Sequence, residues 1–305
     1  MENILSADKI VKFYKTNPAL KYMSMNVPKG AIYGLVGKNG AGKTTLIRIV
    51  SGLQEPSKGQ YTLFGINSDN SRAIRKIRKN MGVMVDSPAV DLDLTARENL
   101  MVQYKIIGIS DYDTIDGLLK SVGLDAKSKK KVKTFSLGMR QRLGIAMALA
   151  GEPEFVILDE PANGIDPQGI IQLRELILRL NREKHTTFLI SSHILDELSR
   201  VATHYGFVDD GRMVKEITAE ELNSYNKKCT RYKLSDIETF ERAAKKLELD
   251  YKVVSENQAD VFGDVKIVDV AVALDKENCN IISATEHNES LEAYYVNLVG
   301  GERDA

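Results

Sequence analysis

A glycine-rich loop between a predicted buried strand and a predicted helix constrains this chain more than any other feature. An apolar run at residues 31–36 leads into the loop Gly-Lys-Asn-Gly-Ala-Gly-Lys-Thr-Thr at residues 37–45, and a second apolar run follows at residues 46–50. This is the phosphate-binding P-loop pattern in the strand–loop–helix context that it requires. Glycines let successive N–H groups converge on a phosphate, and the following helix adds the positive end of its dipole.

Two side chains at the end of this loop have defined chemical uses. Lys43 can place a mobile positive charge on the β- and γ-phosphates of a nucleotide, and Thr44 can offer its hydroxyl to Mg²⁺. The remaining loop residues are expected to contact the nucleotide, and these are Gly37, Lys38, Asn39, Gly40, Ala41, Gly42 and Thr45.

Two further apolar strands end in residues that can do chemistry. The first, at residues 155–158, delivers the paired acids Asp159 and Glu160. The carboxyl edge of a doubly wound α/β sheet is where such folds place their ligands. Asp159 can hold Mg²⁺ through its water shell, and Glu160 can take a proton from an attacking water. The second strand, at residues 186–190, ends at Ser191-Ser192-His193, so His193 is the candidate catalytic histidine.

The rest of the chain predicts two domains. Residues 1–225 contain all the motifs; they open with an antiparallel hairpin (4–14 and 20–27, with a turn at 17–18) and include a helical insertion at about 87–150. Residues 226–305 begin with a linker at 226–228 and suggest a small α+β domain that ends in a helix near 290–298. Tyr14, near the hairpin turn, is either a core residue or a face on which a nucleotide base stacks.

Composition excludes several classes of function. The chain has 305 residues with 42 basic and 42 acidic side chains, so no global field favours a nucleic acid or an anionic membrane. The basic run at 127–133 lacks interleaved aromatics and is better explained as a solvated loop. Cys229 and Cys279 form no metal or disulfide pattern, which suits a reducing cytosol. We expect no signal peptide and no membrane-spanning segment, because no apolar stretch approaches the roughly 18–20 residues needed.

Residues 3 to 225 resemble the nucleotide-binding subunits of ABC transporters. The resemblance rests on five motifs in order: Walker A at 37–44, the ABC signature at 136–139, the Walker B strand with its glutamate at 155–160, the D-loop at 162–166, and the switch histidine His193. It implies an α/β fold of the ABC-type P-loop NTPases, with a mixed or parallel sheet core, an antiparallel β subdomain and an inserted helical subdomain. A small α+β C-terminal domain would follow.

The resemblance also implies partners and an activity. Two copies, or this chain and a paired ABC subunit, would close around ATP and Mg²⁺. Each ATP would then lie between the P-loop of one chain and Ser136 and Gly138 of the other. Tyr14 would stack on adenine. ATP hydrolysis would drive a separate integral-membrane permease, with this chain on the cytoplasmic, inner face of the cell membrane, and no nucleic-acid partner is expected.

Several positions depart from the family pattern. Leu137 and Met139 stand in the signature, and Asn163 replaces a small D-loop serine. Asp86 stands where the family has a glutamine that touches Mg²⁺ and links to the membrane subunit, and it remains a candidate metal ligand. These features look most like the bacterial exporters of drugs, bacitracin and lantibiotics, so the transported substrate is expected to be a drug, a peptide antibiotic or a similar molecule.

Two other functions compete with this interpretation. A soluble ABC ATPase that acts on ribosomes or DNA usually carries two cassettes or a long coiled coil, whereas this chain shows one P-loop, one signature and no heptads. A P-loop nucleotide kinase would have no use for the signature, Glu160 or His193. Import is not excluded by the cassette motifs, and the substrate itself cannot be named from them.

Overall fold

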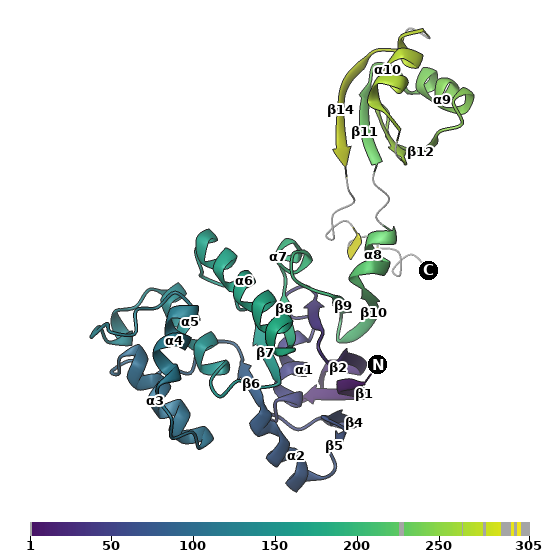
Figure 1. Ribbon diagram of the computed structural model, residues 1–305. Helices are drawn as coiled ribbons and strands as arrows, with labels where there is room; N and C mark the ends of the chain where they lie inside the picture. The colour runs from purple at the N-terminus through teal and green to yellow at the C-terminus, as the bar shows by residue number, and fades with distance from the viewer. Residues whose placement is uncertain are drawn as a thin grey trace. The chain divides into compact units, whose positions relative to one another are not determined.

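The computed structural model of the protein describes residues 2–225, 229–263, 265–276, 279–287, 294–295 and 298–299. Its contacts divide the chain into two compact units, Met1–Ala219 and Glu220–Ala305, which we name the N-terminal and C-terminal units (Figure 1). The predicted linker at 226–228 and most of the helix expected near 290–298 lie outside the described residues.

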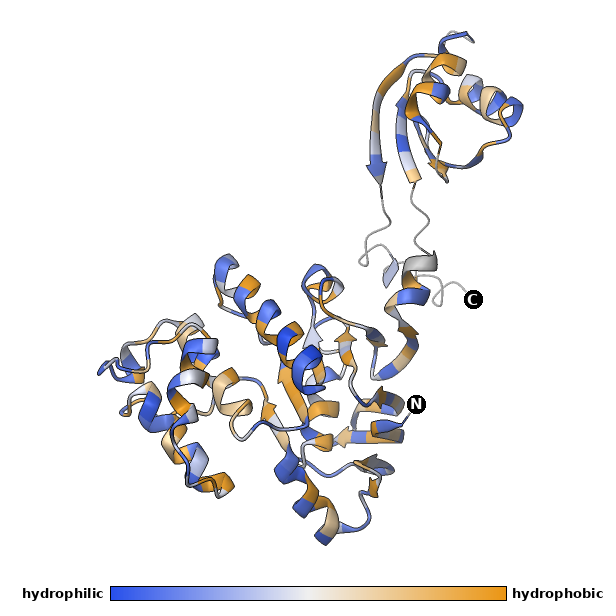
Figure 2. Cartoon of the chain, viewed as in Figure 1, coloured by the Kyte–Doolittle hydropathy of each residue, from blue (hydrophilic) through white to orange (hydrophobic). Residues whose placement is uncertain are grey.

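A six-stranded sheet forms the centre of the N-terminal unit. Its order is β10-β9-β3-β8-β7-β6, and every neighbouring pair is parallel except β10 and β9. The strands are β3 (Ile32–Val36), β6 (Met81–Met84), β7 (Phe155–Asp159), β8 (Thr187–Ser192), β9 (His204–Asp209) and β10 (Arg212–Thr218). All residues of β3, β7 and β8 are buried, which explains their nearly continuous apolar sequences. Figure 2 shows β7, labelled in Figure 1, as predominantly hydrophobic.

A second, antiparallel sheet packs against the first helix of the same unit. Its order is β2-β1-β4-β5, formed by β1 (Asn3–Tyr14), β2 (Asn17–Pro28), β4 (Lys58–Leu63) and β5 (Ile66–Asn67). Its inward side chains share one apolar core with those of helix α1 (Lys43–Val50). The predicted hairpin is confirmed, but its turn lies at Lys15-Thr16, because Asn17 and Pro18 already pair with β1.

The helical insertion lies between β6 and β7 in the sequence and beside β6 in space (Figure 1). It contains α3 (Ala96–Ile107), α4 (Thr114–Ser121) and α5 (Leu137–Ala148). The capping box at the start of α3 is present, since the Thr95 hydroxyl accepts from the backbone N–H of Glu98 and the Glu98 carboxylate accepts from that of Thr95. The other helices of the unit are α2 (Ser71–Ile77), α6 (Pro167–Lys184) and α7 (Leu195–Ser199).

The C-terminal unit is an α+β fold with a core of its own. Helix α8 (Ala219–Tyr225) leads into it from the unit boundary. Its sheet has the order β12-β13-β11-β14 and is antiparallel throughout. The strands are β11 (Cys229–Leu234), β12 (Asp250–Ser255), β13 (Gln258–Phe262) and β14 (Ile281–His287), and the helices are α9 (Ile237–Lys246) and α10 (Ile267–Lys276). Tyr232 and Phe240 are fully buried in its core. Strands β13 and β14 were not predicted from the sequence.

The contact between β6 and α5 generates a stability prediction. A Cβ atom at Gly82 would lie 1.6 Å from the backbone oxygen of Ala148, so Gly82→Ala must push the strand and the helix apart. We expect a loss of at least about 1–3 kcal/mol in the free energy of unfolding of the N-terminal unit, measured by urea denaturation. Gly117→Ala is the matched control: the site is exposed in α4 with no atom within 4 Å of the new Cβ, so a gain of roughly 0.5–1 kcal/mol is expected. Equal effects of the two changes would contradict the packing described.

Candidate functional site

The P-loop connects β3 to α1 in a conformation that needs glycine. Gly40 and Gly42 have φ angles of 82° and 110°, in the left-handed region. At Gly42 a Cβ would also lie 2.8 Å from the side chain of Leu20 and 3.0 Å from the backbone oxygen of Ala19. Lys43 and Thr44 are the first residues of α1, as expected for a loop that presents its N–H groups and a helix N-terminus to a phosphate.

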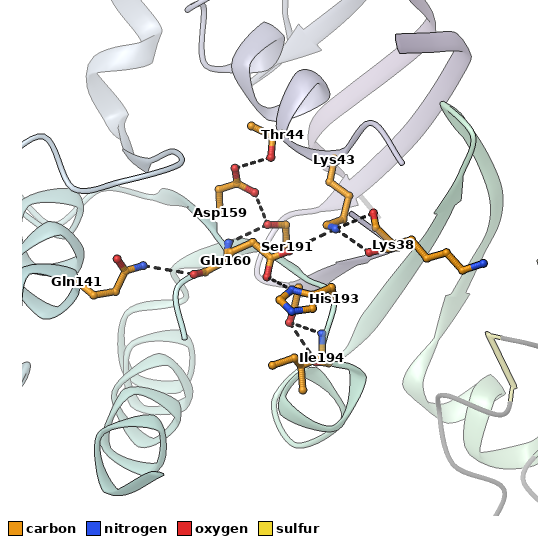
Figure 3. A network of polar contacts seen from close by, with 11 residues as sticks. Lys38, Lys43, Thr44, Gln141, Asp159, Glu160, Ser191, His193 and Ile194 are labelled. Atoms are coloured by element: carbon orange, nitrogen blue, oxygen red, sulfur yellow. Dashed lines mark hydrogen bonds and ion pairs between the residues drawn. The ribbon is translucent and has the colours of Figure 1, made fainter. Parts of the chain in front are cut away.

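Lys43 places its charge inside the loop. Its Nζ atom donates to the carbonyl oxygens of Gly37 at 2.6 Å and Lys38 at 3.3 Å, and it lies 3.3 Å from Oε1 of Glu160 (Figure 3). Only 5% of Lys43 is exposed. The P-loop cation and the strand-end glutamate therefore meet at one point, although 117 positions separate them in the sequence (160 − 43 = 117).

Asp159 is the most deeply buried charged residue of this site, at 1% exposure. The hydroxyl of Thr44 donates to its Oδ2 at 2.8 Å, and the hydroxyl of Ser191 donates to its Oδ1. The parallel register pairs Asp159 of β7 with Ser191 of β8, which brings the two strand ends together. Ser191 was not predicted as a site residue, although its place at the end of an apolar strand was a usable signal.

Glu160 directly follows β7, and its backbone lies in the left-handed region, with φ at 49°. Its backbone N–H donates to the Ser191 hydroxyl at 2.9 Å, and its backbone oxygen accepts from the Gln141 amide at 3.3 Å. A 2.7 Å hydrogen bond joins its Oε2 to Nδ1 of His193 (Figure 3). Oε1 is buried and accepts no hydrogen bond; its neighbour is the Lys43 cation. The carboxylate is thus held between an ammonium group and an imidazole.

A further acid, Glu197, interacts electrostatically with Glu160 and His193. Burial raises the pKa of Glu197, the negative charge of Glu160 raises it further, and His193 lowers it. Glu197 lies on α7, and His193 precedes the N-cap of that helix, Ile194. Glu197 was not predicted as a site residue, because one acid on a short helix has no distinguishing sequence pattern.

Ser136 and Gly138 lie at the start of α5. Ser136 is the N-cap, and its hydroxyl accepts from the backbone N–H of Met139 at 3.2 Å, while the residue itself is exposed. A Cβ at Gly138 would lie 2.7 Å from the backbone oxygen of Gly164, so glycine allows α5 to approach the segment at 161–165. The contacts found for these two residues lie within α5 and with that segment.

Tyr14 lies at the end of β1 with 42% of its surface exposed, so it is not a core residue. Its hydroxyl donates to Oε1 of Gln54 at 2.6 Å. Desolvation raises the pKa of Tyr14, but hydrogen bonds with Thr45, Gln54 and Arg48, together with the charge of Arg48, outweigh it and leave the pKa below its usual value. The phenol end is therefore fixed beside α1, while the ring is partly exposed and has the Lys12 ammonium group over it, 5.9 Å from its centroid.

The three candidate metal ligands do not lie together. Thr44 and Asp159 are in direct contact and offer the hydroxyl and carboxylate oxygens that suit a magnesium ion shared with phosphates. Asp86 instead pairs with Arg48 of α1, with 2.5 Å between Oδ2 and a guanidinium nitrogen. Within the described residues, no group of three or more His, Cys, Asp or Glu side chains could hold a metal by itself.

A glycine-rich loop after β3 whose lysine and threonine meet the two acids at the end of β7, two places along the same sheet, defines a P-loop NTPase. The family model described as ABC transporter matches residues 20–163. The bacitracin transport ATP-binding protein BcrA of Bacillus licheniformis is 39% identical over 99% of both chains, and its namesake in Enterococcus faecalis is 35% identical over 99% of this chain and 98% of its own. The chain belongs to the ABC transporter family, and it is the transporter subunit that binds and hydrolyses ATP.

Further relatives agree with this assignment. The lantibiotic transport ATP-binding protein SrtF of Streptococcus pyogenes is 41% identical over 70% of this chain and 90% of its own. The solved ATP-binding subunit of an ABC transporter matches with a TM-score of 0.65 and 27% identity, over 73% of this chain and 92% of that one. A dimeric bacterial ABC transporter cassette shares the fold, with a TM-score of 0.66 over 70% of this chain and 98% of that one, at 24% identity. None of the described helices is long and apolar enough to cross a membrane.

The Ser191 contacts generate a prediction about the site's integrity. Ser191→Ala removes the donor to Oδ1 of the buried Asp159 carboxylate, whereas the Glu160 backbone N–H keeps a second acceptor, the Ser191 backbone oxygen at 3.2 Å. Leaving such a buried group unsatisfied costs about 1–3 kcal/mol, so urea denaturation should show a loss of that size. Ser199→Ala is the control, since its hydroxyl only donates to a backbone oxygen on the exposed side of α7. An unfolding free energy equal to that of the parent chain would contradict this structural role of Ser191.

Proposed function

We propose that two copies of this chain, or this chain and a paired ABC subunit, close around Mg²⁺-ATP and use its hydrolysis to drive a separate integral-membrane permease. The exported substrate is proposed to be a peptide antibiotic or a similar drug. The observation that carries the mechanism is the meeting of Lys43, Asp159 and Glu160 at one sheet edge. The substrate class rests on similarity along the full chain to two proteins named for bacitracin transport.

Phosphoryl transfer needs positioning and charge neutralisation more than covalent chemistry. Lys43 supplies a buried cation at the mouth of the P-loop, and phosphates that bind there compete with Glu160 for it. Thr44 and Asp159 would hold the magnesium ion, which supplies further positive charge to the phosphates. Glu160 orients and polarises the attacking water, and His193 fixes the direction of its carboxylate.

The positions of the signature residues support the closure of a dimer. Ser136 is exposed at the N-terminus of the 12-residue helix α5, where N–H groups favour an anion. The P-loop residues Lys38, Asn39 and Gly40 are exposed as well. We infer that each P-loop presents its ATP to Ser136 and Gly138 of the second chain, with the adenine on the open face of Tyr14.

A groove in the N-terminal unit fits the proposed permease contact. It has a volume of about 550 Å³ and runs between β6, the segment that follows β6, and helices α3 and α5. Val85, Val102 and Ile106 line it, and 74% of Ile106 is exposed. An apolar groove of this kind accepts the apolar face of an amphipathic helix. The proposed occupant is a cytoplasmic helix of the permease, which would keep this chain on the inner face of the cell membrane.

The assignment of Glu160 predicts a separation of binding from hydrolysis. Glu160→Gln keeps the size of the side chain but removes its charge, so ATP should still bind while turnover falls by about 10²–10⁴-fold. The closed dimer should then accumulate with ATP in size-exclusion chromatography. Glu152→Gln is the control, because Glu152 pairs with Lys184 away from the site. Hydrolysis at the parental rate in Glu160→Gln would refute the assignment.

The proposed permease partner predicts which protein copurifies with this chain from its own cell. Affinity purification from detergent-solubilised membranes, with nuclease treatment, should recover a polytopic membrane protein in near-equal amount. Ile106→Asp should abolish this recovery because it places a charge in the groove, whereas Leu178→Asp, at an exposed apolar position of α6 outside the groove, should not. Recovery of ribosomal or nucleic-acid partners without a membrane protein would support the soluble ATPase alternative instead.

A further inference from the structure

The segment that follows β6 contains an unusual residue at its second position, after Val85. Asp86 has φ at 59°, in the left-handed region that Asp tolerates better than most side chains. Its carboxylate makes a charge-assisted hydrogen bond of 2.5 Å with the guanidinium group of Arg48. The exposed fractions of the two side chains are 34% for Arg48 and 49% for Asp86, so the pair is accessible from solvent.

Arg48 also holds the turn that follows α1. Its backbone oxygen accepts from the N–H groups of Leu53 at 2.8 Å and Gln54 at 3.1 Å. Gln54 in turn accepts the hydroxyl of Tyr14, whose exposed ring is the proposed adenine contact. The hydrogen bond to Asp86 raises the pKa of Arg48 despite some desolvation, and Tyr14 adds to that effect. Arg48 therefore lies between the nucleotide side of the molecule and Asp86.

The residues that follow Asp86 in the sequence form part of the groove wall. Ser87 and Ala89 line it, together with Leu53 from the turn after α1. The next residue after Ser87, Pro88, is seated on α5, since a Cβ atom at Gly144 would lie 2.7 Å from that of Pro88. The segment is thus fixed on one side by Arg48 and on the other by α5, and its middle forms part of the groove wall.

This arrangement bears on which groups bind the metal. Magnesium in nucleotide sites takes one or two carboxylates besides phosphates and water, and Asp159 already supplies one in contact with Thr44. The Asp86 carboxylate is directed instead at a guanidinium cation, which would repel a metal ion placed beside it.

We propose that Asp86 is the counter-ion of Arg48 and not a ligand of magnesium, and that Arg48 is the positioning residue that connects the Tyr14 side of the nucleotide site to the groove wall. The metal part of this inference concerns this chain alone. The groove part rests on the proposed function, because it requires the permease to occupy the groove.

The metal part is tested by calorimetric titration with the non-hydrolysable analogue AMP-PNP, in Mg²⁺ and in EDTA. The ratio of the two dissociation constants measures what the metal adds to nucleotide affinity. Asp86→Asn should leave this ratio at the parental value, whereas Asp159→Asn, which removes a proposed ligand, should lower it about tenfold or more. A fall in Asp86→Asn as large as that in Asp159→Asn would overturn the proposal. An absence of binding in the parent chain would instead refute the proposed function.

The groove part is tested with the chain bound to its copurified permease, by comparing ATP hydrolysis with that of the chain alone. Arg48→Ala and Asp86→Ala should each reduce the stimulation by the permease. The double variant should be no worse than either single one, because both changes break the same pair. Arg48→Lys, which keeps the charge, should restore part of the stimulation, and Lys184→Ala, which breaks the exposed pair with Glu152, should have no effect. Independent, multiplicative effects of the two alanine changes would show that no coupling passes through the pair.

Discussion

The rest of the site depends on the hydrogen bonds that the buried carboxylate of Asp159 accepts. It joins three elements, since β7 carries it, Thr44 of α1 donates to one oxygen, and Ser191 of β8 donates to the other. A carboxylate at 1% exposure is costly without such partners, so the P-loop helix and the two strands must reach their final register together. The same register then brings Glu160 within reach of Lys43 and His193. The geometry of the P-loop is therefore a property of the sheet as much as of the loop's glycines.

The chain leaves two neighbouring parallel strands in the same way. Asp86 follows β6 and Glu160 follows β7, and both have left-handed φ angles, 59° and 49°. Such a conformation costs an ordinary residue on the order of 1–3 kcal/mol and persists where its surroundings determine it. The backbone N–H of Glu160 is held by the hydroxyl of Ser191, and Asp86 is held by the guanidinium group of Arg48. Each turn directs an acid away from the strand and toward a basic side chain of α1.

Patterns with a local physical cause were predictable from the sequence. Glycines and apolar runs defined the P-loop and the buried parallel strands. What escaped prediction depends on pairs that are distant in sequence. The bond of Arg48 to Asp86 crosses 38 positions, so nothing near Asp86 distinguishes a metal ligand from a counter-ion. Strand β13 was missed because its central residue is an acid, Asp260, which is buried only through a two-fold hydrogen bond with Arg231 on the adjacent strand.

The two units divide the work of the chain unequally. The proposed nucleotide, metal and catalytic residues, from Tyr14 to His193, all lie in the N-terminal unit. The C-terminal unit has a separate core around Tyr232 and Phe240, so its stability does not require the ATP site. The lantibiotic transport protein SrtF is matched over 90% of its length by only 70% of this chain, and it therefore has no room for both units in full. The two bacitracin transport proteins match over 98% or more of their lengths. The alignments with the bacitracin transport proteins therefore include the C-terminal unit, although none of the proposed nucleotide, metal or catalytic residues lies in it.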